Sequence, residues 1–169
     1  MGLFAKVIIF TVFVPGTVAV VIPRALLGGG PVRFGSCYLP GLILIAMGVS
    51  TYMWCVWDFA YRGRGTPAPI DPPTALVATG LYRFVRNPMY IGVLLVLLGE
   101  SIALVSAPLF RYFLAVWVMF HLLVILYEEP TLRRNFGSAY SQYCNKVSRW
   151  IPCRPKRPER DLTASSNPE

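Results

Sequence analysis

Two short segments of this 169-residue chain contain most of the side chains that could do chemistry. "YRFVRNPMYIG" (82–92) leads into a long apolar run, and "YEEPTLRRNFG" (127–137) follows another. The first segment offers arginines, tyrosines and an amide, and the second offers two adjacent acids. Arginine matches a carboxylate with a bidentate fork, glutamate accepts hydrogen bonds from a ribose diol, and a tyrosine ring attracts a cation. Together these groups suit a zwitterionic cofactor that carries hydroxyl groups.

Most of these groups also have a purely structural explanation. Arginines beside a membrane span often anchor it, an Asn-Pro pair often begins a helix, and tyrosines are common at the membrane interface. The acidic pair Glu128-Glu129 is harder to explain in this way, because two acids at a helix C-terminus oppose the macrodipole and repel each other. We therefore expect Arg86 or a ligand to compensate them.

The composition is that of a membrane protein. The chain is 55% hydrophobic and 14% charged, with a mean hydropathy of +0.54, which is too apolar for an ordinary soluble domain. Four apolar segments have the length that a bilayer requires, about 20 helical residues. They predict an all-α integral membrane protein with transmembrane helices at 3–22, 37–57, 89–105 and 109–127. For the first of them a secretory signal peptide is the alternative.

The predicted third and fourth spans are separated by little more than "SAP", so they should form a tight antiparallel hairpin. A hairpin brings 82–92 and 127–137 together on one face of the membrane. Residues 1–153 then form one domain, and the basic segment 154–169 is predicted to be a disordered tail.

A further helix is predicted after Gly137, on the cytoplasmic surface of the membrane. The pattern there indicates an interfacial helix, because its apolar residues recur at helical spacing while Lys146 lies off their stripe. The stripe consists of Phe136, Tyr140, Tyr143, Val147 and Trp150.

The distribution of charge predicts the orientation. Thirteen of the 16 Lys and Arg residues lie in the 61–88 loop or in the two terminal segments, and only Arg24, Arg33 and Arg111 lie on the other side. The positive-inside rule therefore places the loop and both termini in the cytoplasm. The small size and the absence of an evident retention signal favour a bacterial inner membrane over the endoplasmic reticulum.

Metal and nucleic-acid chemistry are not expected. The four cysteines show no CxxC pair and no metal-ligand spacing with His121, the only histidine. The partners that the chain predicts are membrane lipids and a lipophilic or lipidated substrate, with no nucleic acid. Its oligomeric state stays open.

Two ionisable residues fall inside predicted spans, Glu100 in the third and His121 in the fourth. An intramembrane ionisable residue is a functional candidate by default. We expect a contact between the two, which either holds a substrate headgroup or forms a structural pair within the hairpin. Gly92 and Gly99, seven residues apart, predict close helix packing.

The motifs resemble a known superfamily. "LVATGLYRFVRNPMYIG", followed by "EEPTLRRNFGSAYSQYCNKVSRWIP", is similar to the isoprenylcysteine carboxyl methyltransferases and phospholipid methyltransferases. These are integral membrane enzymes that use S-adenosylmethionine. The resemblance covers residues 63–152, about half the chain.

The resemblance implies specific roles for residues of this chain. It implies catalytic roles for Arg86, Asn87 and Glu128. The residues that it places against the cofactor are Thr74, Ala75, Leu76, Val77, Gly80, Tyr82, Asn87, Pro88, Met89, Tyr90, Glu128 and Glu129.

The chain departs from the family pattern at two positions. Asn87 stands where many members have histidine; it can make similar hydrogen bonds but cannot act as a base. Val124 stands where eukaryotic relatives have an arginine implicated in holding the prenylcysteine carboxylate. Prenylcysteine is therefore less secure than the methyl donor.

The resemblance implies methyl transfer from S-adenosylmethionine to a lipophilic acceptor at the cytoplasmic face of the membrane. We expect a prenylcysteine-like or other apolar carboxylate or thiol. The alternatives are a phospholipid amine, a reaction like that of the NADPH-dependent sterol reductases, or a scaffold without enzymatic activity. A sulfonium is intrinsically reactive, so the protein mainly has to align the two reactants and exclude water.

Overall fold

The computed structural model describes residues 15–28, 34–35, 38–62 and 78–152. Most of the predicted first span, the predicted cofactor residues Thr74–Val77 and the tail 154–169 lie outside these ranges. The described part is helical, and its only β feature is an isolated bridge between Val85 and Ser148.

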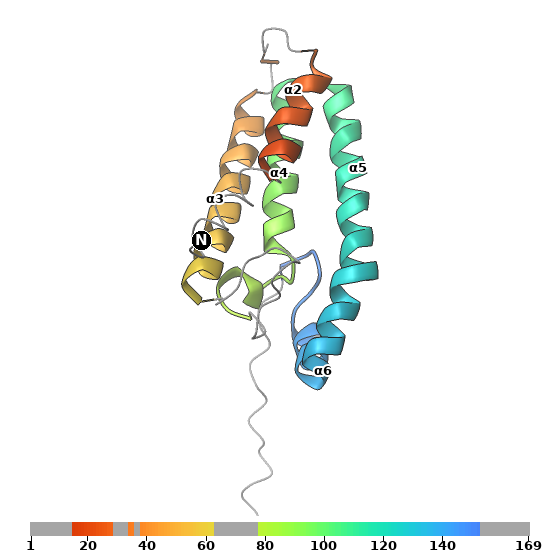
Figure 1. Ribbon diagram of the computed structural model, residues 1–169. Helices are drawn as coiled ribbons and strands as arrows, with labels where there is room; N and C mark the ends of the chain where they lie inside the picture. The colour runs from red at the N-terminus through yellow and green to blue at the C-terminus, as the bar shows by residue number, and fades with distance from the viewer. Residues whose placement is uncertain (1–14, 29–33, 36–37, 63–77, 153–169) are drawn as a thin grey trace, which may run out of the picture.

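The helices run up and down beside one another (Figure 1). Helices α2, α3, α4 and α5 lie side by side, while η2 and α6 lie at the end where α3 finishes and α4 begins. The elements are η1 (Thr17–Val21), α2 (Ile22–Leu26), α3 (Tyr38–Arg62), η2 (Gly80–Arg83), α4 (Pro88–Ala103), α5 (Ala107–Leu123), η3 (Val124–Glu128) and α6 (Glu129–Lys146).

Two helices of the described part are long and apolar enough to cross a membrane: Tyr38–Asp58 and the continuous helix Ala107–Lys146. Thr17–Leu26 and Pro88–Ala103 are apolar but shorter. With 16 residues, α4 rises about 24 Å, against about 30 Å of hydrocarbon. The four-span arrangement therefore stays a prediction.

The predicted hairpin is confirmed. Only Leu104–Ser106 separates α4 from α5, and Ser106 caps α5 by accepting a hydrogen bond from the backbone of Leu109 (3.4 Å). Pro88 stands in the first turn of α4, as expected. Asn87 precedes it but does not cap the helix with its side chain, because that side chain is engaged elsewhere.

A seam of glycines joins α3 to α4. A Cβ at Gly92 would lie 2.9 Å from the carbonyl oxygen of Gly48, and a Cβ at Gly99 would lie 2.6 Å from that of Gly41. Both pairs are seven residues apart, so two turns of each helix meet almost backbone to backbone. The close packing predicted for Gly92 and Gly99 is confirmed, and their partner is α3.

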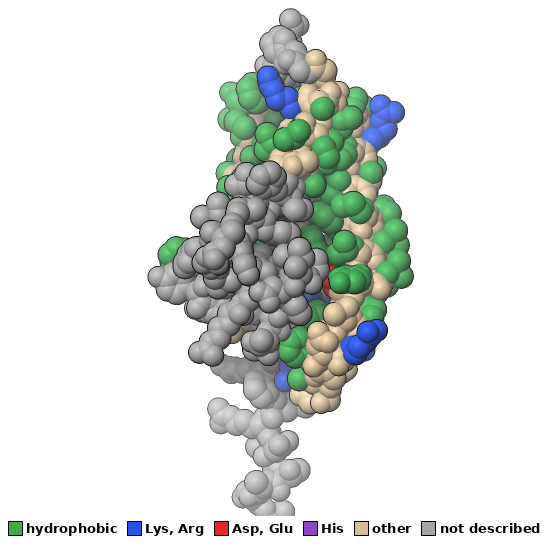
Figure 2. All heavy atoms as spheres, in the orientation of Figure 1, with side chains coloured by type: hydrophobic (Ala, Val, Ile, Leu, Met, Phe, Trp, Pro, Cys, Tyr) green, Lys and Arg blue, Asp and Glu red, His purple; other side chains and the backbone are tan. Residues whose placement is uncertain are grey.

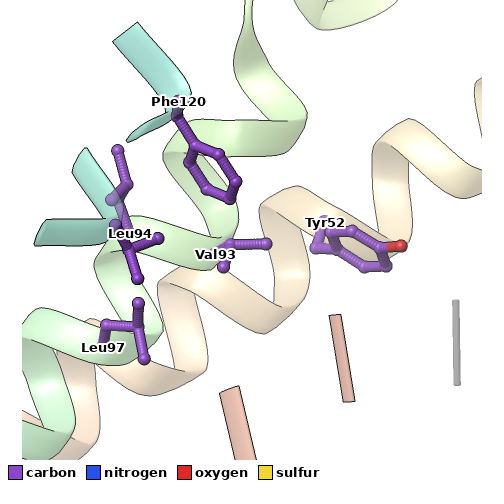
Figure 3. Close-up of a cluster of buried hydrophobic side chains, with 6 residues drawn as sticks. Tyr52, Val93, Leu94, Leu97 and Phe120 are labelled. Atoms are coloured by element: carbon purple, nitrogen blue, oxygen red, sulfur yellow. The ribbon is translucent and has the colours of Figure 1, made fainter. Parts of the chain in front are cut away.

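The apolar core lies beside this seam, where α4 runs between α3 and α5 (Figure 1). Tyr52 of α3 and Val93, Leu94 and Leu97 of α4 pack with side chains of α5, including Phe120 (Figure 3). The outer surface is apolar as well. Figure 2 shows hydrophobic side chains over the middle of one face and basic side chains toward its two ends.

Exposed apolar residues on α5 include Leu114, Trp117, Val118 and Leu122. A soluble monomer rarely exposes so large an apolar face, whereas a lipid-facing helix requires one. This surface agrees with the membrane character expected from the composition.

The helix predicted after Gly137 differs from α6. Helix α6 already begins at Glu129 and continues from α5 through the π-helical turn η3; Gly137, with φ +52°, breaks it internally. It ends at Lys146, and Val147 is extended. Val147 and Trp150 are therefore not part of a helical stripe, and that part of the prediction is wrong.

We expect Gly92→Ala to destabilise the protein by about 1–3 kcal/mol, because the added methyl group overpacks the seam. Thermal unfolding in detergent, followed by circular dichroism, measures the effect. Gly16→Ala is the matched control: Gly16 is helical, and nothing lies within 4 Å of an added Cβ. Equal unfolding temperatures for the two variants would contradict the seam.

Candidate functional site

The two polar segments meet at one end of the helices, as the hairpin predicted. The hydroxyl of Tyr90 donates a hydrogen bond to Oε1 of Glu128, and Nη1 of Arg86 lies 3.1 Å from Oε1 of Glu129. The two glutamates are adjacent in the chain, yet each reaches a different partner.

Glu129 binds two arginines. Nε and Nη2 of Arg149 donate to its two carboxylate oxygens at 2.6 and 3.0 Å, and Arg86 donates to one of them. The side chains of Glu129 and Arg86 are only 10% and 13% exposed. Burial by itself raises the pKa of Glu129, but the hydrogen bond from Arg149 and the nearby positive charges outweigh it, so the pKa is lowered. The expected compensation by Arg86 is confirmed for Glu129.

A segment that sequence reasoning did not predict completes the site. Residues Val147–Trp150, here called the strap, run back from the end of α6 toward the start of α4 (Figure 1). The backbone of Arg86 donates to the carbonyl of Ser148 (2.9 Å), and the side-chain amide of Asn87 donates to the carbonyl of Arg149 (3.1 Å). The strap thus lies along the residues that precede α4. Its backbone is not helical, so it has no helical periodicity by which the sequence could have revealed it.

Tyr82 and Tyr143 border the same region. Tyr143 donates its hydroxyl proton to the carbonyl oxygen of Tyr82 (2.6 Å), which connects α6 to η2. Burial raises the pKa of both tyrosines, so both stay protonated and can act as hydrogen-bond donors.

Gly80 has a structural reason to be glycine. Its φ is +57°, and a Cβ at this position would overlap the carboxylate of Asp58 at the end of α3. Of the other predicted cofactor residues, Pro88 is fully buried and Met89 packs against the apolar core. These three residues therefore have structural contacts that position the loop before α4.

The predicted contact between Glu100 and His121 is wrong. Glu100 lies near the end of α4 that is remote from the site, and Tyr112 of α5 is within electrostatic range of it. Nδ1 of His121 accepts a hydrogen bond from Nε1 of Trp150 (3.0 Å). The contact fails because α5 begins at Ala107, opposite the end of α4, and His121 lies about two and a half turns beyond Tyr112 along α5.

The site contains a buried hydrogen-bond donor that no described residue uses, which fits the cofactor that the sequence resemblance implies. Nε of Arg86 is buried and has no hydrogen-bond partner within the described residues. A buried donor of this kind carries a desolvation cost until an acceptor reaches it. Arg86 for a carboxylate and Glu128 for a diol are the groups that S-adenosylmethionine would require.

Comparison with known proteins identifies the family of the chain. Residues 36–139 match the family described as "Phospholipid methyltransferase". That match covers more than half of the chain, and the protein belongs to this family.

Curated relatives match a shorter stretch. The chain is 39% identical over 83 residues to "Protein-S-isoprenylcysteine O-methyltransferase" of Schizosaccharomyces pombe, covering 47% of this chain and 34% of the relative. It is 38% identical over 80 residues to "Protein-S-isoprenylcysteine O-methyltransferase A" of Arabidopsis thaliana, covering 46% and 39%. A "Probable protein-S-isoprenylcysteine O-methyltransferase" of Oryza sativa subsp. indica is 37% identical over 79 residues, covering 46% and 40%. The matches thus span two fifths or less of the relatives' length.

We expect Glu129→Gln to destabilise the protein by about 1–3 kcal/mol, because it removes the charge that two arginines share. Thermal unfolding in detergent at pH 7 tests this, with Arg134→Gln on the exposed side of α6 as the control. Similar stability of the two variants would contradict a structural role for the Glu129 cluster.

The same cluster predicts a pH dependence. The pKa of Glu129 is lower in the folded protein than in the unfolded chain, so its contribution is complete above the unfolded value, about 4.3. This contribution is lost as the pH falls through the lower, folded value. The stability difference between wild type and Glu129→Gln should therefore shrink between pH 5 and pH 3. A difference that stays constant over this range would exclude an ionised Glu129 as its source.

Proposed function

We propose that this protein is a membrane methyltransferase that transfers a methyl group from S-adenosylmethionine to the carboxylate of a lipophilic acceptor. The observation that carries the proposal is one end of the helices that holds both the half-buried Glu128–Tyr90 hydrogen bond and the buried, unused Nε of Arg86. Membership of the family and the similarity to isoprenylcysteine O-methyltransferases support it.

The two acids take different roles in this proposal. Both carboxylate oxygens of Glu129 already accept hydrogen bonds from arginines, so Glu129 holds the site together. Glu128 accepts a hydrogen bond from the hydroxyl of Tyr90, which leaves further lone pairs of its carboxylate as acceptors for the ribose hydroxyls. Arg86 directs its Nε toward the amino-acid carboxylate. Tyr82 and Tyr90 line the methyl-bearing part of the donor; the other predicted donor contacts, Thr74–Val77, lie outside the described residues.

Methyl transfer requires little from the protein beyond the correct placement of the donor and the acceptor. When bound, S-adenosylmethionine would supply an electrophilic methyl group, which the acceptor carboxylate takes as the sulfur–carbon bond breaks, with no proton to remove. Asn87 therefore needs no basicity, and its amide can support the strap through Arg149. The strap and the apolar residues around Phe120 exclude water from the reacting atoms.

The topology follows the distribution of charge. We place four spans in the membrane, with the 61–88 loop, both termini and α6 in the cytoplasm, and favour a bacterial inner membrane. An acceptor dissolved in the bilayer would reach the site from the lipid side, where α5 exposes its apolar residues.

The amines of phospholipid headgroups are the second candidate acceptor, because the matching family is described as "Phospholipid methyltransferase". An amine must lose a proton before or during transfer. A carboxylate avoids this step, and the relatives in Schizosaccharomyces pombe and Arabidopsis thaliana are named as O-methyltransferases of protein S-isoprenylcysteine, not as N-methyltransferases. The carboxylate is therefore preferred.

We expect calorimetry of the purified protein to detect binding of S-adenosylmethionine and none of NADPH. Glu128→Gln should weaken binding by roughly tenfold or more, because it loses a charged hydrogen-bond acceptor. Tyr112→Phe, which removes a hydrogen bond to Val18 far along α5, is the control and should bind normally. A folded wild type that binds NADPH and not S-adenosylmethionine would refute the proposal.

We expect a fluorescent protein fused to either end of the chain to fold and fluoresce in a bacterial host, because both termini lie in the cytoplasm. Alkaline phosphatase fused at the same positions should stay inactive. Active phosphatase at one end only would mean an odd number of spans and would refute the four-span topology.

A further inference from the structure

His121 lies between two indole rings near the site. Its ring is stacked on that of Trp117, with centroids 5.8 Å apart, and Trp150 of the strap approaches at 6.1 Å. Nε1 of Trp150 donates a hydrogen bond to Nδ1 of His121 (3.0 Å). None of these contacts is used by the groups assigned to the methyl donor.

This hydrogen bond determines the protonation of the imidazole. An indole N–H can only donate, so Nδ1 must carry a lone pair. A histidine with a bare Nδ1 is neutral and carries its proton on Nε2. Nε2–H is thus a fixed donor, and it has no hydrogen-bond partner among the described residues.

The position of His121 connects this donor to both the site and the lipid. Trp150 follows Arg149, whose side chain binds Glu129 and whose carbonyl accepts from Asn87. On α5, His121 lies between Trp117, which is 42% exposed, and Val124, which is buried. The donor therefore stands at the border between the apolar outer face and the interior.

From this geometry we propose that Nε2–H of His121 binds the carboxylate of the lipophilic methyl acceptor, and that Trp150 is a positioning residue that holds His121 in the required tautomer. The inference rests on the proposed function and names the recognition group for its acceptor. A neutral donor suits this place, because an apolar setting penalises a free positive charge but makes a hydrogen bond to an anion stronger. Val124, one turn farther along the helix, is apolar and contributes no donor.

The acceptor probe is N-acetyl-S-farnesylcysteine, and its methyl ester is the matched ligand without a carboxylate. Binding of each to the full chain in detergent is measured by calorimetry without a methyl donor. We expect His121→Phe, which keeps a ring between the indoles, to weaken binding of the acid roughly tenfold or more and to leave the ester unchanged. His121→Gln, which retains an N–H donor, should recover part of the loss, and Tyr112→Phe should bind both ligands as wild type does.

A spectroscopic readout separates positioning from simple packing. The chain has one histidine, so ¹⁵N-histidine labelling reports on His121 alone. The wild type should show the neutral Nε2–H tautomer, and its Nε2 resonance should move on addition of the acid. In Trp150→Phe the other tautomer should appear. No change with the acid, or equal losses for acid and ester in His121→Phe, would overturn the proposal.

Three further outcomes are informative. If anionic phospholipid vesicles move the Nε2 resonance and block the acid, the site belongs to a lipid phosphate, and the carboxylate assignment is wrong. If the acid binds through His121 but S-adenosylmethionine does not bind, the inference holds while the proposed methyl transfer fails. The reverse result, donor binding with no dependence of acid binding on His121, overturns the inference alone.

Discussion

One carboxylate, that of Glu129, holds together three segments that are distant in the sequence. Arg86 precedes α4, Glu129 begins α6, and Arg149 lies in the strap. Burying a carboxylate is costly unless its charge is paired and its lone pairs are hydrogen-bonded, and here both oxygens have donors. Since the pairing is satisfied only when all three segments meet, the ion cluster ties the formation of the site to the docking of the strap.

The glycine seam is the second constraint, and it acts inside the predicted membrane region. Lipid offers no hydrophobic drive for one helix to join another, so close backbone contact has to supply the attraction. The pairs Gly41–Gly99 and Gly48–Gly92 provide it over two turns of α3 and α4. A fixed α3 also fixes its C-terminal end, where Asp58 lies against Gly80 and so places η2. The position of the loop that enters the site is therefore connected to packing deeper in the bundle.

The sequence predicted the parts that depend on length and order. A three-residue link forces a hairpin, and the hairpin brings Arg86 and the acidic pair to one end. It could not predict which acid meets which partner, because this depends on the rotation of the helix around η3. The strap was missed for a different reason: a segment of bends and one isolated bridge has no helical period, and the apolar spacing of Val147 and Trp150 imitated one. Glu100 and His121 were paired by depth alone, whereas contact also requires the correct face and helix register.

The π-helical turn η3 precedes Glu129 directly and alters the direction of the side chains at the acidic pair, whose two members have different hydrogen-bond partners. A π turn inserts an extra residue into the helical repeat and rotates the side chains that follow, and such turns are common at functional sites. Here η3 spans Val124–Glu128 and ends at the acidic pair. Glu128 reaches Tyr90 on α4, while Glu129 turns to the two arginines. The arginines neutralise the charge of Glu129, whereas Glu128 has only a tyrosine hydroxyl against it; in the proposed function, Glu128 is therefore the acid that accepts hydrogen bonds from the donor.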